Sequence, residues 1–280
     1  MTPTTVLTGL CFGEGPRWHD GRLYLSDIHD RCVLAVDPDG TRRTIVEVEH
    51  WPSGLGWTPD GELLVVSVTD RRLLRYDGRR LSTVADLSTL ASFHCNDMVV
   101  DRGGRAYIGN FGFDLFASAP FKPAELIRVD PDGSARVVAT DMAFPNGAVI
   151  TPDGAVLIVA ESFAARLTAF DIARNGDLSN RRVWAKLPQD AVPDGICLDQ
   201  AMGVWVASPS TQECLRVERG GRVTQRVRFD RSAYACMLGG KDCKQLYVLT
   251  ASTSDPATCK ERRDGRVEVV AAPHAGAGLP

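Results

Sequence analysis

Four oxygen-bearing side chains recur along the chain at the points where apolar, strand-like runs begin: Glu14, Asn96, Asn146 and Asp194. Two are carboxylates and two are amides, so together they offer two negative charges and neutral carbonyl oxygens. Such a set suits a hard divalent cation, because oxygen ligands are those that Ca²⁺, Mg²⁺ and Mn²⁺ prefer. Cation binding requires these four residues, which are distant in sequence, to meet at one point. The alternative is that they cap the starts of strands and hold water in the channel.

The spacing of the strand starts indicates how these residues could meet. Six such runs begin along the chain, and the steps between their starts are 39, 43, 50, 48 and 41 residues. A period near forty that is built from short strands is typical of a β-propeller, in which the same position of every repeat faces one axis. The six starts read Glu14-Gly15, Ser53-Gly54, Asn96-Asp97, Asn146-Gly147, Asp194-Gly195 and Ala235-Cys236.

Each repeat contains two hairpins. Turn signals such as Pro59-Asp60-Gly61 and Pro152-Asp153-Gly154 separate runs that are rich in β-branched and aliphatic residues. Four antiparallel strands in each of six repeats predict an all-β, six-bladed β-propeller that occupies residues 1–280 as a single domain. The pattern requires no helix, and it assigns Thr258 to Arg262, followed by Asp264-Gly265, to the second hairpin of the last repeat.

Two segments lie outside this repeat pattern. Thr4 to Leu10 could add a strand to the last blade and so close the ring. Phe111 to Pro123 forms the longest insertion and contains several phenylalanines. A long loop with apolar residues often forms a wall or lid over a pocket; packing against the neighbouring blade is an equally good interpretation.

The predicted topology places further polar residues beside the four candidate ligands. The second strand of each blade returns to the end of the ring where the first strand begins, so its last residues share that rim. Asn110 and Glu161 are therefore candidate substrate contacts. His94 is a third candidate, with an exposed loop histidine as the alternative. Asp97 is a fourth; strand alternation should turn it away from the axis, where it either orients Asn96 or makes a strand-start hydrogen bond.

Composition and missing motifs exclude several classes of protein. A net charge of −3 and a sequence pI near 6.0 indicate no nucleic-acid partner. We expect no membrane segment and no signal peptide. The eight cysteines form no Cys-x-x-Cys pair and fit the buried, reduced thiols of a cytoplasmic protein. Serine-hydrolase, zinc-protease and phosphate-loop motifs are absent from the sequence.

The chain also resembles a known family. Its motifs Gly13-Glu14-Gly15-Pro16, Asn96-Asp97, Phe144-Pro145-Asn146-Gly147 and Pro193-Asp194-Gly195 look like those of the senescence-marker-protein/gluconolactonase/luciferin-regenerating-enzyme family, the regucalcin-like lactonases. The likeness covers nearly the whole chain. It implies a propeller with one catalytic divalent metal ion on Glu14, Asn146 and Asp194, and it implies that Asn96 lies close to the metal and the substrate.

The function that this resemblance implies is hydrolysis of a small-molecule lactone, often a sugar lactone, by metal-activated water attack. The cation would polarise the ester carbonyl, and Asp194 would act as general base, a role that rests on the resemblance. Ca²⁺ is the favoured ion, with Zn²⁺, Mn²⁺ and Mg²⁺ as alternatives. Sugar-lactone members commonly carry Arg where this chain has His94, which points to a less polar substrate.

Three other functions stay open from the sequence. The first is a metal-dependent hydrolase of phosphotriesters or other activated esters on the same site. The second is a non-catalytic metal-binding or protein-binding propeller, which would turn over no lactone. The third, ranked lowest, is a synthase that joins carbon centres on a related propeller. The sequence does not indicate an oligomeric state.

Overall fold

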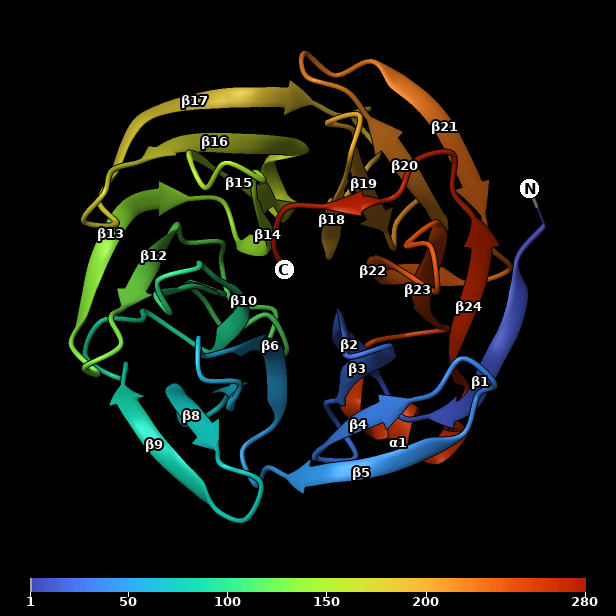
Figure 1. Ribbon diagram of the computed structural model, residues 1–280, viewed down its shortest axis with the longest axis horizontal. Coiled ribbons are helices and arrows are strands. Elements are labelled where there is room, and N and C mark those ends of the chain that lie inside the picture. The colour runs from blue at the N-terminus through green and yellow to red at the C-terminus, as the bar shows by residue number, and fades with distance from the viewer. Residues whose placement is uncertain (1) are drawn as a thin grey trace.

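Six antiparallel sheets surround a central axis as the blades of a propeller in the computed structural model, which describes residues 2–280 (Figure 1). The predicted all-β, six-bladed fold is confirmed. From the inside outwards, the first three blades are β2–β5 (Gly13–His19, Arg22–Asp27, Cys32–Val36, Arg42–Glu47), β6–β9 (Pro52–Trp57, Leu63–Ser67, Arg72–Tyr76, Leu81–Asp86) and β10–β13 (Cys95–Val100, Ala106–Asn110, Ala124–Val129, Ala135–Met142). The others are β14–β17 (Pro145–Ile150, Val156–Glu161, Arg166–Ile172, Leu178–Lys186), β18–β21 (Ile196–Asp199, Val204–Ser208, Glu213–Val217, Val223–Arg228) and β22–β24 with β1 (Ser232–Gly239, Gln245–Ala251, Gly265–Ala271, Thr4–Leu10).

Strands from the two ends of the described chain complete two of the blades. β1 pairs antiparallel with β24, with Thr4 opposite Val269, so the ring closure considered for Thr4 to Leu10 is confirmed. β25 (Gly276–Ala277) pairs with the innermost strand β18 and makes that sheet five-stranded. The last residues therefore cross one end of the central channel, close to the axis (Figure 1).

The last blade departs from the prediction at Thr258 to Arg262. These residues lie in helix α1 (Pro256–Arg262), and a second, one-turn helix, η1, spans Ser162–Ala164. The predicted hairpin and the prediction of no helix were wrong. Asp255 accepts a hydrogen bond from Thr258 N at 2.9 Å, and Pro256 occupies the first turn, so a strong local helix start outweighs the repeat pattern.

The innermost strands carry a β-bulge at the predicted ligand positions. In β2, Glu14 lies opposite Ser26, whereas Arg17 lies opposite Tyr24, so the inner strand holds one extra residue. The same shift occurs between Cys95 and Met98 in β10 and between Pro145 and Ala148 in β14. A bulge breaks regular alternation and redirects side chains. It is therefore the local feature that sets the direction of Glu14, Asn96 and Asn146, the three candidate ligands that lie in strands.

Close contact between neighbouring inner strands brings the ligand positions near one another. A Cβ added at Gly147 would lie 2.6 Å from Ile196 N and 2.7 Å from Asp194 O, both in the next blade. A Cβ at Gly54 would lie 2.4 Å from Met98 N, again in the next blade. Only glycine fits where two backbones approach so closely. This requirement explains the Gly that follows most of the predicted strand starts.

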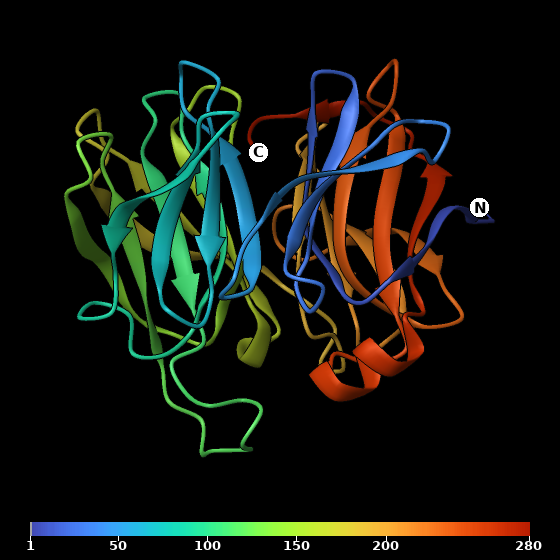
Figure 2. The ribbon, with the colours of Figure 1, turned by 90° about the horizontal axis from the view of Figure 1, so that it is seen from below.

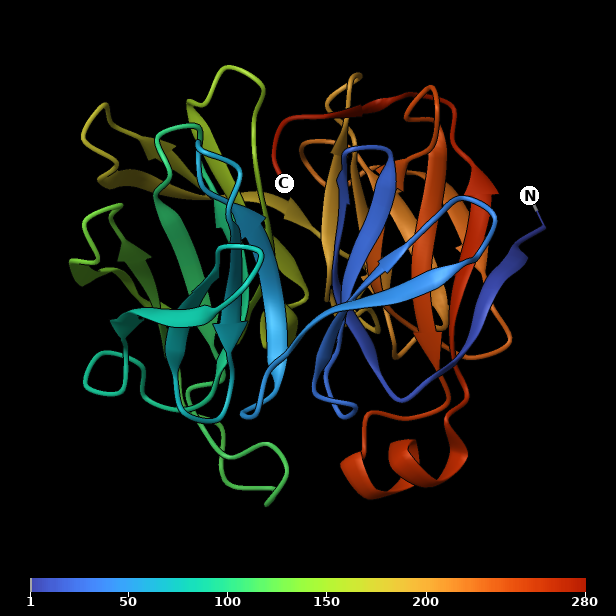
Figure 3. The same cartoon turned by 60° about the horizontal axis from the view of Figure 1, so that its bottom comes forward.

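Two projections mark one end of the propeller. The loop between β11 and β12, residues 111–123, and helix α1 extend from the same end, whereas the C terminus lies towards the other (Figures 2 and 3). The apolar core lies between neighbouring blades, as where Leu64 and Met98 belong to one buried cluster. Within residues 2–280, no helix has the length and apolar character that crossing a membrane would require.

Candidate metal centre and substrate recess

All four predicted ligand residues line one recess, which has a volume of about 610 Å³ including its open mouth. Glu14, Asn96 and Asn146 come from the innermost strands of three blades, and Asp194 lies two residues before β18 in a fourth. The recess opens at the end that carries the two projections, since residues of the 111–123 loop and Ser254 also line it. The four residues, which are distant in sequence, therefore border one and the same recess.

Hydrogen bonds to the protein orient the two amide side chains. Asn96 Nδ2 donates to the Pro145 carbonyl at 3.4 Å, and Asn146 Nδ2 donates to Ser162 Oγ at 3.2 Å. Ser162 Oγ in turn donates to the Pro193 carbonyl at 2.7 Å, which fixes it between two blades. Because the amide nitrogens are used in this way, the two carbonyl oxygens stay available as ligands for a cation.

The two carboxylates border the recess, and both residues are half-buried. Burial, reinforced by the charges of Asp194 and Asp97, raises the pKa of Glu14 well above its ordinary value, and Arg17 offsets this only in part. Burial and the charge of Asp97 raise the pKa of Asp194 to about 8. Neither carboxylate forms an ion pair with a basic side chain within residues 2–280, so both are costly to ionise unless a cation is bound. The donor set and its charge therefore fit a divalent ion held by Glu14, Asn146 and Asp194.

Asp97 forms a buried ion pair beneath the recess and does not line it. Arg17 Nη2 contacts Asp97 Oδ1 at 2.7 Å, with both side chains less than a tenth exposed. Arg17 Nε also donates to the Leu55 carbonyl at 2.9 Å, so one guanidinium links the inner strands of three blades. Asp97 Oδ1 also accepts a hydrogen bond from Met98 N at 2.8 Å, which is the strand-start hydrogen bond that the sequence left open as the alternative to orienting Asn96.

Replacing Arg17 by Met is expected to lower the free energy of unfolding by about 3–5 kcal/mol, because Asp97 would remain as an unpaired buried charge. Urea denaturation of the metal-free protein measures this. The double variant Arg17→Met, Asp97→Asn should lose less than Arg17→Met alone, since it removes the orphaned charge. A denaturation midpoint that Arg17→Met leaves unchanged would rule out a structural role for the pair.

The structure does not bring Asn110, Glu161 or His94 to the surface of the recess. Asn110 Nδ2 donates to the Glu125 carbonyl at 2.9 Å, and its Oδ1 accepts from Gly112 N, so it anchors the start of the loop. Glu161 is fully buried and binds the Arg166 guanidinium at 2.8 Å and the Ala143 amide at 2.8 Å. Each is the cross-strand partner of the residue just before a candidate ligand: Asn110 lies opposite Cys95, and Glu161 lies opposite Pro145. Because side chains alternate between the two faces of a strand, these two side chains point away from the axis that the ligands face.

His94 lies behind the aromatic wall of the recess. Its ring is 5.9 Å from that of Phe111 and 6.5 Å from that of Trp51, and both of these residues line the recess. Burial lowers the pKa of His94, so the ring is neutral near pH 7. It therefore supports the wall and does not add a charge to it.

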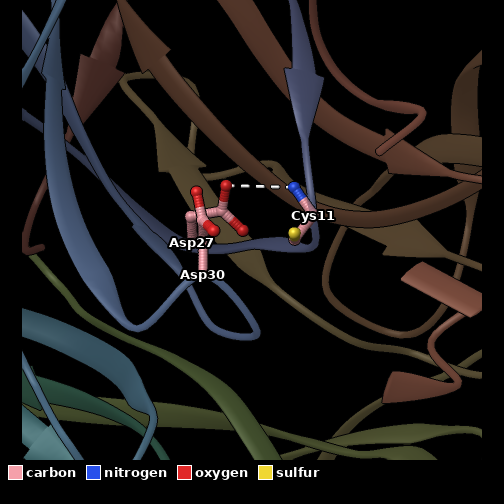
Figure 4. A group of neighbouring side chains, drawn as sticks. All are labelled: Cys11, Asp27 and Asp30. Atoms are coloured by element: carbon pink, nitrogen blue, oxygen red, sulfur yellow. Dashed lines mark hydrogen bonds between the residues drawn. The ribbon is translucent and has the colours of Figure 1, made fainter. Parts of the chain in front are cut away.

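A second group of potential ligands, Cys11, Asp27 and Asp30, lies elsewhere in the first blade (Figure 4). Asp27 accepts hydrogen bonds from the amides of Cys11 at 3.0 Å and Phe12 at 2.8 Å, and Asp30 is paired with Arg263 at 2.7 Å. Burial raises the pKa of the Cys11 thiol to about 11, which opposes the thiolate form that binds metals. Asp27 is the last residue of the second strand of its blade, the position that Asn110 and Glu161 occupy in their blades. The hydrogen bonds and the ion pair of this group therefore explain its carboxylates without a metal ion.

Several residues that line the recess were not predicted from the sequence as candidate site residues. His29, Trp51, Ser53 and Tyr234 all line it. His29 lies just beyond the end of the second strand of its blade, a position that the predicted topology already assigns to this rim. Its Nδ1 is buried without a partner among the described residues, whereas its Nε2 is 3.3 Å from the Ser254 carbonyl. Burial lowers its pKa, which leaves a neutral ring with one free polar atom.

Comparison with known proteins identifies the family. The family model described as the SMP-30/gluconolactonase/LRE-like region matches residues 12–252, a span that includes all four ligand candidates. The chain belongs to this family. The family resemblance of the sequence motifs is thus confirmed.

Curated relatives and solved structures agree with this assignment. The chain is 30% identical to pentonolactonase XacC of Haloferax volcanii over 263 residues, which are 90% of this chain and 86% of the relative. It is 30% identical to regucalcin of Danio rerio, over 85% of this chain and 82% of the relative. A luciferin-regenerating enzyme of known structure superposes with a TM-score of 0.82 at 19% identity, over 99% of this chain and 98% of the other, which supports the fold.

Proposed function

We propose that this family member is a divalent-metal-dependent lactone hydrolase and that the recess is its active site. The main observation is that two half-buried carboxylates and two oriented amides from four blades line one recess, and that within residues 2–280 neither carboxylate forms an ion pair. The pentonolactonase name of a relative with 30% identity over most of both chains supports lactones as the substrate class. Ca²⁺ is our preferred ion, with Zn²⁺, Mn²⁺ and Mg²⁺ as alternatives, and the cytoplasmic location stays a prediction.

In this proposal, Glu14, Asn146 and Asp194 hold the cation. A bound divalent cation would supply Lewis-acid polarisation of the lactone carbonyl and would make water more acidic. It would also restore the ionised form of Asp194, because an opposite charge nearby favours a carboxylate. The residues of the chain then position the lactone and move a proton.

Asp194 is the proposed general base. It accepts a proton from the attacking water while the water oxygen bonds to the carbonyl carbon. The ring C–O bond breaks, and the leaving oxygen takes this proton from Asp194, which gives a hydroxy acid and returns Asp194 to its ionised form. Asn96, on the neighbouring wall of the same recess, can contact the carbonyl end of the lactone or the carboxylate of the product. The Asn146–Ser162–Pro193 hydrogen bonds keep the blades of Asn146 and Asp194 in register.

A pH-stat screen tests the reaction class. Several lactones, a phosphotriester and an aryl ester are offered to the chelated protein and then to protein restored with each of the four metals. We expect acid release from at least one lactone with at least one metal, and only background release without metal. Faster turnover of the phosphotriester than of every lactone would replace the proposed activity by the first alternative. No turnover of any substrate with any metal would favour a binding protein.

A further inference from the structure

The walls of the recess show which lactones it is built to accept. Resting on the proposed lactone hydrolase function, we propose that the site selects lactones that carry an apolar alkyl or aryl substituent over polyhydroxylated sugar lactones. The substituent would lie against the aromatic wall formed by Trp51, Phe111, Phe116 and Phe144, while the ester group lies at the carboxylates and amides.

The wall is one connected aromatic surface that runs from the strand ends to the projecting loop. The rings of Phe111 and Phe144 are 4.7 Å apart, those of Phe111 and Phe116 are 6.3 Å apart, and those of Trp51 and Phe116 are 5.8 Å apart at nearly a right angle. Contacts at such distances hold the rings in fixed relative positions. The recess therefore offers a preformed apolar face, which needs little reorganisation to bind an apolar group.

Phe116 extends this face into the mouth of the recess. It belongs to the loop between β11 and β12 that projects from the end of the ring (Figure 2). The residue is 42% exposed although it lines the recess. An apolar substituent would cover this exposed ring and remove both apolar surfaces from water, which is favourable in proportion to the area removed.

Sugar lactones would find too few polar partners in the same place. No Lys or Arg lines the recess within residues 2–280. Beyond the proposed metal ligands and Asn96, the polar side chains that line it are His29, Ser53, Tyr234 and Ser254. His29 Nδ1 is itself buried and so offers a hydroxyl no exposed atom, and an aldonolactone carries a hydroxyl on nearly every carbon. Hydroxyls buried without partners weaken binding, and a site built to select them supplies a partner for each.

A homologous series of substrates tests the preference. The metal-loaded enzyme is assayed with δ-valerolactone, with δ-lactones that carry progressively longer alkyl chains up to δ-decalactone, and with D-glucono-δ-lactone. We expect kcat/KM to rise about fourfold for each methylene that enters the recess, and gluconolactone to be a poorer substrate than δ-valerolactone. A flat series, or gluconolactone as the best substrate, would overturn the preference and leave lactone hydrolysis intact. If none of these lactones is hydrolysed, the proposed function itself fails.

A matched pair of variants tests the location of the apolar contact. Phe116→Ala should lower the ratio of kcat/KM for δ-decalactone to that for δ-valerolactone by about tenfold. Phe121→Ala is the control, because Phe121 lies in the same loop and is 49% exposed but packs on Phe113 and Phe163 outside the recess. It should leave the ratio within twofold. An unchanged ratio in Phe116→Ala, or an equal fall in both variants, would contradict the proposed contact.

Discussion

Replacing Asp194 by Asn is expected to lower kcat for lactone hydrolysis by at least two powers of ten. The variant keeps the shape of the side chain but removes both a charge that holds the cation and the proposed proton acceptor. The rate of lactone opening under saturating substrate and metal measures the effect. The melting temperature of the metal-free variant should stay at or above that of the parent, because a neutral side chain avoids burying a charge.

Two further variants show which role of Asp194 is lost. Glu14→Gln removes a ligand charge but not the proposed base, so it should regain a substantial part of its activity at high metal concentration, whereas Asp194→Asn should not. Asp30→Asn alters the other group of potential ligands, at an exposed ion pair with Arg263, and should keep full activity. Full activity in Asp194→Asn would remove this residue from the mechanism.

Removal of the metal is expected to have an effect of similar size. Exhaustive chelation should lower lactone hydrolysis at least a hundredfold, and one of Ca²⁺, Mn²⁺, Zn²⁺ or Mg²⁺ should restore it. The ion should also stabilise the fold, by about 2.7 kcal/mol at a concentration one hundred times its dissociation constant. For a chain of this length, that corresponds to a rise in melting temperature of roughly 5 °C.

Thermal melts with and without each ion measure the stabilisation, and metal analysis of the chelated sample verifies the removal. Glu14→Gln, Asp194→Asn should show no rise in melting temperature, because both carboxylates that attract the cation are gone. Full hydrolysis by protein that retains less than a hundredth of an equivalent of metal would contradict a metal-dependent mechanism. A rise in the double variant equal to that of the parent would place the stabilising ion elsewhere.

The repeat architecture could be predicted because its signals are local and are repeated six times. Turn residues and apolar runs recur near a forty-residue period, and symmetry then brings Glu14, Asn96, Asn146 and Asp194 to one axis without any knowledge of individual contacts. Glycines such as Gly147 belong to the same signal, since the close approach of inner strands demands them. The sequence could not decide whether β1 pairs with the last blade, because pairing between strands that are distant in sequence leaves no local pattern.

The details of the recess could not be predicted because they depend on side-chain direction. The bulges in β2, β10 and β14 insert one residue into each inner strand, and strand alternation alone cannot foresee them. Asn110 and Glu161 lie at the predicted end of the ring. Each of them pairs with the residue just before a ligand, however, so its side chain points into the blade and not into the recess. Helix α1 also escaped the repeat pattern, although its start at Asp255 and Pro256 is a recognisable local signal.

The most direct test of the metal centre is an anomalous difference map from a crystal of this protein soaked in Mn²⁺. A single strong peak is expected in the recess, with oxygens of Glu14, Asn146 and Asp194 at about 2.0–2.6 Å from it. A recess without a peak, or a peak at Cys11, Asp27 and Asp30 alone, would show that the four residues gathered at the axis do not form a metal site.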